Sequence, residues 1–217
     1  MRTFDLSAFL FILEAAKWTL ALSAIAFVGG AILGLVIALA RTSESRTARG
    51  LAIGFIQIFQ GTPLLLQLFL IFFGAPVLGL DINPWIAAGA ALILNSAAFL
   101  GEIWRGCIEA IPRGQLEAAQ ALNLRYAARM RDVILPQAFR IALAPTVGYT
   151  VQIIKGTSLA AIIGFTEITR AGQIINNATF QPLEVFTTVA ALYFAICWPL
   201  SLLAAHMERK RARALAR

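Results

Sequence analysis

The sequence predicts an all-α integral membrane protein with five transmembrane helices. Of its 217 residues, 59% are apolar and 13% are charged, and the mean hydropathy is +0.79. Soluble domains usually hold about 25% charged residues, so this chain has more apolar surface than a water-soluble core can bury. Its apolar residues recur in long stretches. Each stretch must be helical, because lipid offers no hydrogen-bond partner to a free backbone amide.

Five stretches meet the requirement of about 20 mostly apolar residues for a transmembrane helix. The first is longer than the apolar region of a cleaved signal peptide, and similar stretches follow it. The predicted spans cover residues 18–40, 51–73, 84–104, 141–165 and 184–206. We therefore expect one transmembrane domain over residues 1–217, with a long cytoplasmic loop at about residues 107–137.

The net charge of +7 arises from basic residues that gather between and after the predicted spans. Such residues favour the cytoplasmic side of a membrane protein. The N-terminus is then outside, and an odd number of spans places the C-terminus in the cytoplasm. The predicted cytoplasmic residues are Arg41, Arg46, Arg49, Arg113, Arg125, Arg129, Arg131, Arg140, Arg209, Lys210, Arg211, Arg213 and Arg217, and the predicted outer ones are Arg2, Lys17 and Arg170.

Two patterns inside the spans concern packing. Small residues spaced four apart in the first span allow another helix to approach closely, either within this subunit or from a second one. Amides in the second span need partners or water, so they are expected to face the bundle interior or a pore. The small residues are Ala26, Gly30, Gly34 and Ala38, and the amides are Gln57, Gln60 and Gln67.

The loop between the third and fourth spans is predicted to form two short helices. Pro112 suits a helix start, and good helix formers follow from Gln115 to Leu122. Asn123 can adopt the left-handed conformation that ends a helix. A second helix is expected from about Arg125 to Ile134, with Arg125 and Arg129 on one face and Pro136 ending it. Such a unit is either a docking surface or an interfacial element whose arginines contact anionic lipid head groups.

Ionisable residues within the membrane are costly and often functional. Lys155 lies inside the fourth span beside Gly156, Thr157 and Ser158, and is either a substrate or gating contact or a member of a structural ion pair. Glu102 and Arg105 are spaced to pair on one helix face. They form either a structural pair or a site at which Glu102 meets a cationic group of a substrate.

Several separated motifs resemble those of polar amino-acid permeases of bacterial type I ABC importers, in the histidine/glutamine/arginine group. The loop matches the family pattern at Glu117, Ala118, Ala119, Leu135 and Pro136, with Asn123 in place of glycine. The other matches are Gly61-Thr62-Pro63-Leu64-Leu65 with Gln60 in place of arginine, Glu102 with Arg105 and Gly106, Lys155 with Thr157, Ser158 and Leu159, and Glu167.

The resemblance implies a MetI-like permease fold whose subunit pairs with an identical or paralogous permease in the bacterial inner membrane. It also implies two cytoplasmic ATPase subunits, an amino-acid-binding protein outside, and transport of a polar amino acid. The residues expected to contact the ATPase are Glu117, Ala118, Ala119, Asn123, Arg125, Leu135 and Pro136. The substrate path would include Gln60, Thr62, Glu102, Arg105, Lys155, Thr157 and Ser158.

The chain lacks a G-x-x-x-x-G-K-[ST] loop, so we expect it to be no ATPase and to bind no cofactor, with ATP and magnesium used by the partner. It also lacks a nucleophile–base set and a metal-ligand cluster, and Cys107 and Cys197 are expected to be packing residues. A gradient-driven secondary transporter or small channel without an ATPase is the alternative. A membrane scaffold without transport is a third possibility.

Overall fold

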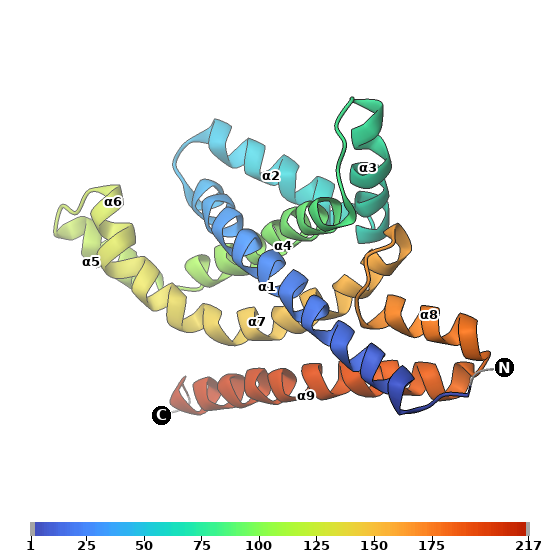
Figure 1. Ribbon diagram of the computed structural model, residues 1–217. Helices are drawn as coiled ribbons and strands as arrows, with labels where there is room; N and C mark the ends of the chain where they lie inside the picture. The colour runs from blue at the N-terminus through green and yellow to red at the C-terminus, as the bar shows by residue number, and fades with distance from the viewer. Residues whose placement is uncertain (1–2, 216–217) are drawn as a thin grey trace.

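The protein is a bundle of helices, and no strand occurs in residues 3–215, which the computed structural model describes (Figure 1). Arg2 and Arg217, assigned above to opposite sides of the membrane, lie outside the described residues. The elements are α1 (Leu6–Thr42), α2 (Arg46–Gly61), α3 (Leu64–Val77), α4 (Pro84–Glu109), α5 (Arg113–Ala121), α6 (Tyr126–Ala128), the π-helix η1 (Arg129–Ile134), α7 (Leu135–Gly156), the 3₁₀-helix η2 (Thr157–Ile163), α8 (Ile168–Thr179) and α9 (Pro182–Leu215).

Three helices of the described chain, α1, α4 and α9, are long and apolar enough to cross a membrane alone. Two further spans arise if each of two bent helix pairs crosses as one unit. The continuous span predicted at residues 51–73 is wrong in detail, since α2 and α3 meet there at 100°. The predicted span at residues 141–165 begins earlier, at Leu135, and ends as a 3₁₀-helix before a bend of 46°.

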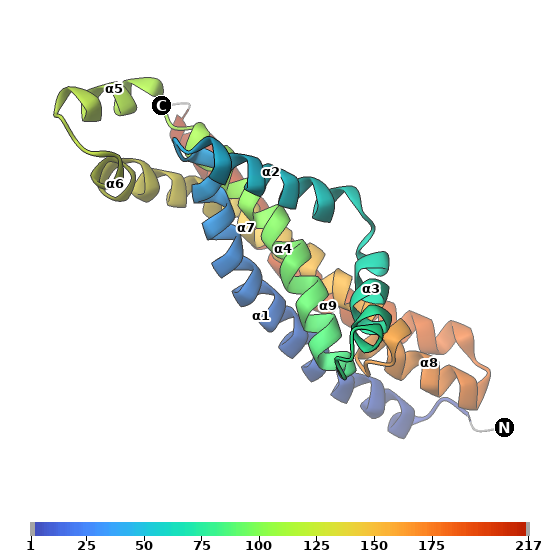
Figure 2. The ribbon, with the colours of Figure 1, turned by 90° about the horizontal axis from the view of Figure 1, so that it is seen from above.

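The two ends of the bundle differ in what they carry. Figure 2 shows α5, α6 and the C-terminal end of α9 together at one end, whereas the N-terminus and α8 lie at the other. The loop after α1 belongs to the first end, because Glu44 forms an ion pair with Arg129 there. The basic segments that the charge pattern groups together are therefore on one side of the bundle.

The small-residue stripe of α1 packs against α4 within the same subunit, which decides between the two alternatives left by the sequence. A Cβ on Gly30 would lie 2.5 Å from the Cβ of Ser96, and one on Gly34 would lie 3.2 Å from the carbonyl oxygen of Ala97. A Cβ on Gly101 would come within 2.8 Å of Ile37. The two helices cross with their backbones nearly in contact, as small residues permit.

The corner between α2 and α3 forms because Pro63 cannot donate a backbone hydrogen bond to Phe59. Two side-chain amides replace that donor: Gln67 Nε2 donates to the Phe59 carbonyl at 2.9 Å, and Asn95 Nδ2 donates to it at 3.3 Å. The Thr62 hydroxyl donates to the Ile58 carbonyl at 2.7 Å. Gln67 is buried, as predicted for these amides. Gln60 is exposed, but its Nε2 donates to the Ala98 carbonyl of α4 at 3.2 Å, so it too has a partner in the bundle, whereas Gln57 is exposed.

Candidate functional site: a helical elbow and two polar groups

The loop between α4 and α7 is a helical elbow, defined as Arg113–Ile134. Its first helix, α5, follows Pro112 and ends at Asn123, which has a φ of 54°. The Asn123 amide donates to the Gln120 carbonyl at 2.8 Å, and the Leu124 amide donates to the Ala119 carbonyl at 3.1 Å. This pair of bonds is the Schellman pattern of a helix C-terminus, so the turn predicted from Asn123 is confirmed.

One face of α5 is free for a partner. Glu117 and Ala118 are exposed, and Leu116 and Leu122 expose 37% and 74% of their surfaces. Ala119, in contrast, is buried, at 3% exposed. Within the described chain, Glu117 forms no salt bridge. The outward side of α5 therefore presents a carboxylate between apolar side chains.

The second half of the elbow differs from the prediction of a separate helix ended by Pro136. After the single turn of α6, the π-helix η1 runs directly into α7, and Leu135 and Pro136 lie in the first turn of α7. Proline is tolerated at the start of a helix, and the wider π-turn precedes it. Gln137 Nε2 donates to the Val133 carbonyl at 2.8 Å, which supplies a donor at this junction.

Arg125 and Arg129 lie one α-helical turn apart, since the Arg129 amide donates to the Arg125 carbonyl at 2.9 Å. The two arginines differ in exposure. Arg125 is exposed at the N-cap of α6, whereas only 12% of the Arg129 side chain is exposed. The Arg129 guanidinium lies 5.5 Å from the centroid of the Tyr126 ring and 3.2 Å from the Glu44 carboxylate.

An apolar cluster and a polar contact hold the elbow to the ends of α1 and α4. The Tyr126 hydroxyl donates to the Thr42 carbonyl at 3.4 Å. The buried members of the cluster are Ala38, Ile108, Ile111, Met130, Ile134 and Ala138. The elbow is thereby in contact with three long helices, α1, α4 and α7.

The predicted path residues fall into two separate groups. The ionic group lies where α1 and α4 end: Arg105 Nε donates to Glu102 Oε1 at 2.9 Å, and Arg105 also pairs with Glu109. Arg41 Nε lies 3.9 Å from the other Glu102 oxygen. This arrangement supports the structural ion pair over a substrate contact for Glu102 and Arg105, and it adds Arg41, which the sequence did not connect with them.

The second group surrounds the place where two broken helices meet. Gly156, at the end of α7, faces the α2–α3 corner, since a Cβ there would lie 3.2 Å from Leu64 Cδ2. Gln60, Thr62 and Lys155 are exposed, and Lys155 takes part in no salt bridge within residues 3–215. The structure thus gives no support to an ion pair for Lys155.

The hydroxyls beside Lys155 are occupied by their own helix. The fully buried Thr157 donates to the Ile154 carbonyl at 2.7 Å, and Ser158 donates to the Lys155 carbonyl at 2.7 Å. Both bonds satisfy carbonyls where α7 tightens into η2, so Thr157 does not line an open path.

The roles of two polar residues were not predicted from the sequence. Asn95 on α4 donates to Gln67 Oε1 at 3.2 Å and to the corner carbonyl described above. Glu167, which the sequence offered only as a family match, is completely buried: it accepts from the Tyr193 hydroxyl at 2.6 Å and caps α8 through the Arg170 amide at 2.9 Å. A lone asparagine in an apolar helix was the available signal for Asn95.

The chain joins a helical elbow with an exposed carboxylate to a helical bundle that contains two bent helix pairs. The family described as the binding-protein-dependent transport system inner membrane component matches residues 30–213. The chain therefore belongs to that family.

Curated relatives match over nearly the whole chain. The glutamine transport system permease protein GlnP of Escherichia coli is 38% identical, with 92% of each chain covered. The arginine transport system permease protein ArtQ of Bacillus subtilis is 36% identical, again with 92% of each covered. The probable amino-acid ABC transporter permease protein YckA of Bacillus subtilis is 35% identical and covers 95% of this chain and 92% of its own.

Solved structures agree with the observed fold. A crystal structure of an amino acid ABC transporter with histidines has a TM-score of 0.86 at 34% identity, covering 92% of this chain and 94% of that one. An inward-facing MetNI methionine ABC transporter has a TM-score of 0.75 at 20% identity, covering 92% and 95%. The second likeness bears on the fold alone.

Proposed function

We propose that this chain is the transmembrane subunit of an ATP-driven importer that carries a polar amino acid across the bacterial inner membrane. The observation that carries the proposal is the elbow, whose α5 exposes Glu117 while its other side is held by α1, α4 and α7. The names of the relatives, which include glutamine and arginine permeases, support an amino acid as the substrate.

In this proposal the elbow is the contact for a separate ATPase. Glu117, Ala118 and the turn at Asn123 would lie in a groove of the ATPase, with Arg125 at the edge of the contact. Ala119 inside the elbow, and Leu135 and Pro136 in the first turn of α7, would act by holding α5 against η1 and α7. The chain itself would bind no cofactor, and the ATP and magnesium would be held by the partner.

The unbroken course from α6 through η1 to α7 gives this contact a mechanical consequence. A rigid helix transmits a displacement along its length, and alternating access needs two discrete packings. The far end of α7 faces the α2–α3 corner. Movement of the elbow would therefore change the contact between the two helix breaks.

We place the substrate path beside these breaks. Discontinuous helices in transporters present helix ends and free carbonyls to a substrate, and the zwitterion of an amino acid requires both signs of charge or their equivalents. Lys155 supplies the positive charge, and Gln60, Thr62 and Ser158 supply polar side chains near it. Glu102, Arg105 and Thr157 would support the path by holding their helices.

The assembly would follow from the same proposal. The N-terminus and α8 would face outward toward an amino-acid-binding protein, and the basic end would face the cytoplasm. Two ATPase subunits and a second permease subunit, identical or paralogous, would complete the importer. The second permease would close the path that a single subunit leaves open.

The test is uptake into vesicles that contain this chain with its cognate ATPase. Binding protein loaded with a labelled polar amino acid is added outside, and ATP is enclosed. We expect accumulation that requires ATP hydrolysis and survives collapse of ion gradients. Uptake that follows an imposed ion gradient without ATP would contradict the proposal and support a secondary transporter.

A further inference from the structure

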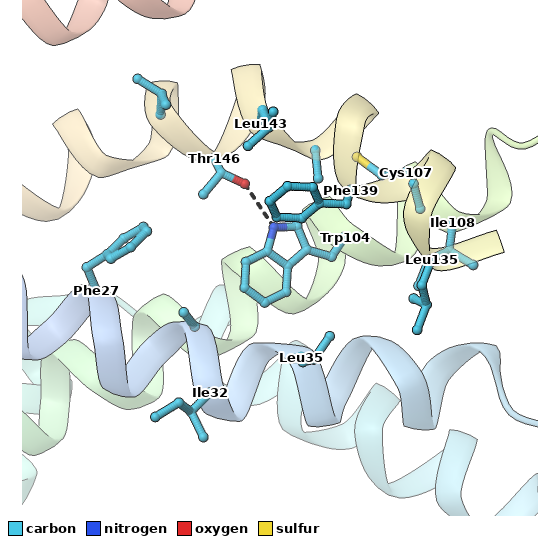
Figure 3. Close-up of a pocket in the computed structure, with 14 residues that line it drawn as sticks. Phe27, Ile32, Leu35, Trp104, Cys107, Ile108, Leu135, Phe139, Leu143 and Thr146 are labelled. Atoms are coloured by element: carbon cyan, nitrogen blue, oxygen red, sulfur yellow. Dashed lines mark hydrogen bonds between the residues drawn. The ribbon is translucent and has the colours of Figure 1, made fainter. Parts of the chain in front are cut away.

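A cavity of about 660 Å³ lies between α1, α4 and α7, at the end of the bundle that carries the elbow (Figure 3). Its wall is almost entirely hydrocarbon. The indole N–H of Trp104 donates to the Thr146 hydroxyl at 2.9 Å, so the indole donor in the wall is paired. An occupant would have to be largely apolar, because a polar group buried against hydrocarbon without a hydrogen-bond partner is costly. The main apolar lining residues are Phe27, Leu35, Ile108, Leu135, Phe139 and Leu143.

The length of the cavity fits one leaflet of a bilayer. Its lining residues on α7 run from Leu135 to Val147, which corresponds to about 18 Å of helix. The hydrocarbon of one leaflet is about 15 Å deep, half of a typical core. The cavity is also open sideways, since Ile32 and Phe139 in its wall are 63% and 65% exposed. An extended chain entering from the membrane would fit this shape better than a compact solute.

Positive charge lies at the elbow end of the same cavity. Arg140 is exposed on α7, directly after the lining residue Phe139. Arg211 on α9 is close enough for its charge to act on the thiol of Cys107, which also lines the cavity. Basic residues at this depth attract anionic head groups. We propose that the cavity binds an acyl chain of an anionic phospholipid, whose head group lies beside Arg140 and Arg211.

Trp104, which lies in the wall of the cavity, provides a direct probe of this site. We would replace Trp18, Trp85 and Trp198 with phenylalanine, leaving Trp104 as the single fluorophore of the full chain. The protein is reconstituted in phosphatidylcholine vesicles that contain increasing fractions of phosphatidylglycerol with brominated acyl chains. A matched series uses brominated phosphatidylcholine instead.

We expect brominated phosphatidylglycerol to quench Trp104 at a mole fraction about 25-fold lower than brominated phosphatidylcholine does, the gain expected from two basic residues. A variant that keeps only Trp198, which is 52% exposed on α9, should be quenched equally by both lipids. Arg140→Gln combined with Arg211→Gln should abolish the preference at Trp104.

A pair of substitutions on one helix separates the cavity from general lipid contact. In Ala31→Phe the larger side chain fills part of the cavity and should weaken the quenching of Trp104. Ala24 lies outside the lining, so Ala24→Phe should leave the quenching unchanged. Equal quenching of Trp104 by both lipids would overturn the proposal, because contact would then be unselective. Absence of quenching by either lipid would also overturn it, since a second copy or another subunit would then cover the cavity. Both of these results are read from the unsubstituted cavity, so they stand even if Ala31→Phe does not fold.

Discussion

The contact between α1 and α4 at Gly30 predicts a measurable cost for adding a single methyl group. In Gly30→Ala the new Cβ would lie 2.5 Å from the Ser96 Cβ and 3.3 Å from the Ala97 amide nitrogen. Carbon atoms in contact prefer about 3.5–4.0 Å, so the two helices must separate by about 1 Å. The Ser96 Cβ is bound to the backbone and the residue is 1% exposed, so it cannot turn away.

The loss of stability caused by Gly30→Ala is measured against a matched control. Overpacking a close contact costs about 1–3 kcal/mol, while replacing glycine with alanine inside a helix gains about 1 kcal/mol. Gly54→Ala, in α2, has only the gain in helix propensity, because no atom lies within 4 Å of its new Cβ. The propensity gain cancels in the comparison, so Gly30→Ala should be less stable than Gly54→Ala by about 1–3 kcal/mol.

The assay is reversible unfolding of the purified chain in mixed micelles with increasing sodium dodecyl sulfate, followed by tryptophan fluorescence. It gives the free energy of unfolding of each variant. If the two variants agreed within about 0.5 kcal/mol, the usual scatter of neutral substitutions, then α1 and α4 would not be in close contact in the folded protein.

Three further substitutions test the elbow, the path and the corner. Glu117→Lys should leave the free energy of unfolding within about 0.5 kcal/mol of the parent, as expected for an exposed site, but it should abolish ATP-dependent uptake. Gln120→Lys, at the exposed Gln120 of the same helix, is the control for the added charge. Normal uptake by Glu117→Lys would exclude the contact between Glu117 and the ATPase. Lys155→Leu should strongly reduce uptake while leaving the free energy of unfolding nearly unchanged. If the variant instead failed to fold and showed no specific transport defect, Lys155 would have a structural role. Gln67→Leu should lower the free energy of unfolding by about 1–3 kcal/mol, because the carbonyl of Thr62 loses its donor. Gln57→Leu, at an exposed position, should not lower it. Equal stability of the Gln67→Leu and Gln57→Leu variants would show that the α2–α3 corner does not depend on Gln67.

Some of the candidate site was accessible from the sequence because it depends on local chemistry. Asn123 ends α5 in the left-handed conformation, and this follows from the short polar side chain of asparagine alone. The start of α5 after Pro112 is likewise a property of a few neighbouring residues. The exposure of Glu117 follows from its place on a polar helix.

Other parts of the site required the packed chain. Pro63 lies inside a stretch that the sequence predicts as one continuous span, and the 100° corner there depends on Gln67 and on Asn95, which belongs to another helix. The low exposure of Arg129 depends on its ion pair with Glu44, in the loop after α1. Residues far apart in the chain supply these partners, and no periodicity reveals them.

Composition and local patterns were enough to predict a helical membrane protein, the positions of its apolar stretches and the polar elbow between two of them. Hydropathy and helix-end chemistry act on neighbouring residues, so they can be read along the chain. The packed fold was needed to show which carbonyl each buried amide satisfies, that Glu102 lies among arginines from two helices and that Glu167 is enclosed. Each of those outcomes depends on which helices come into contact, because a buried polar group is stabilised only by partners that packing brings to it.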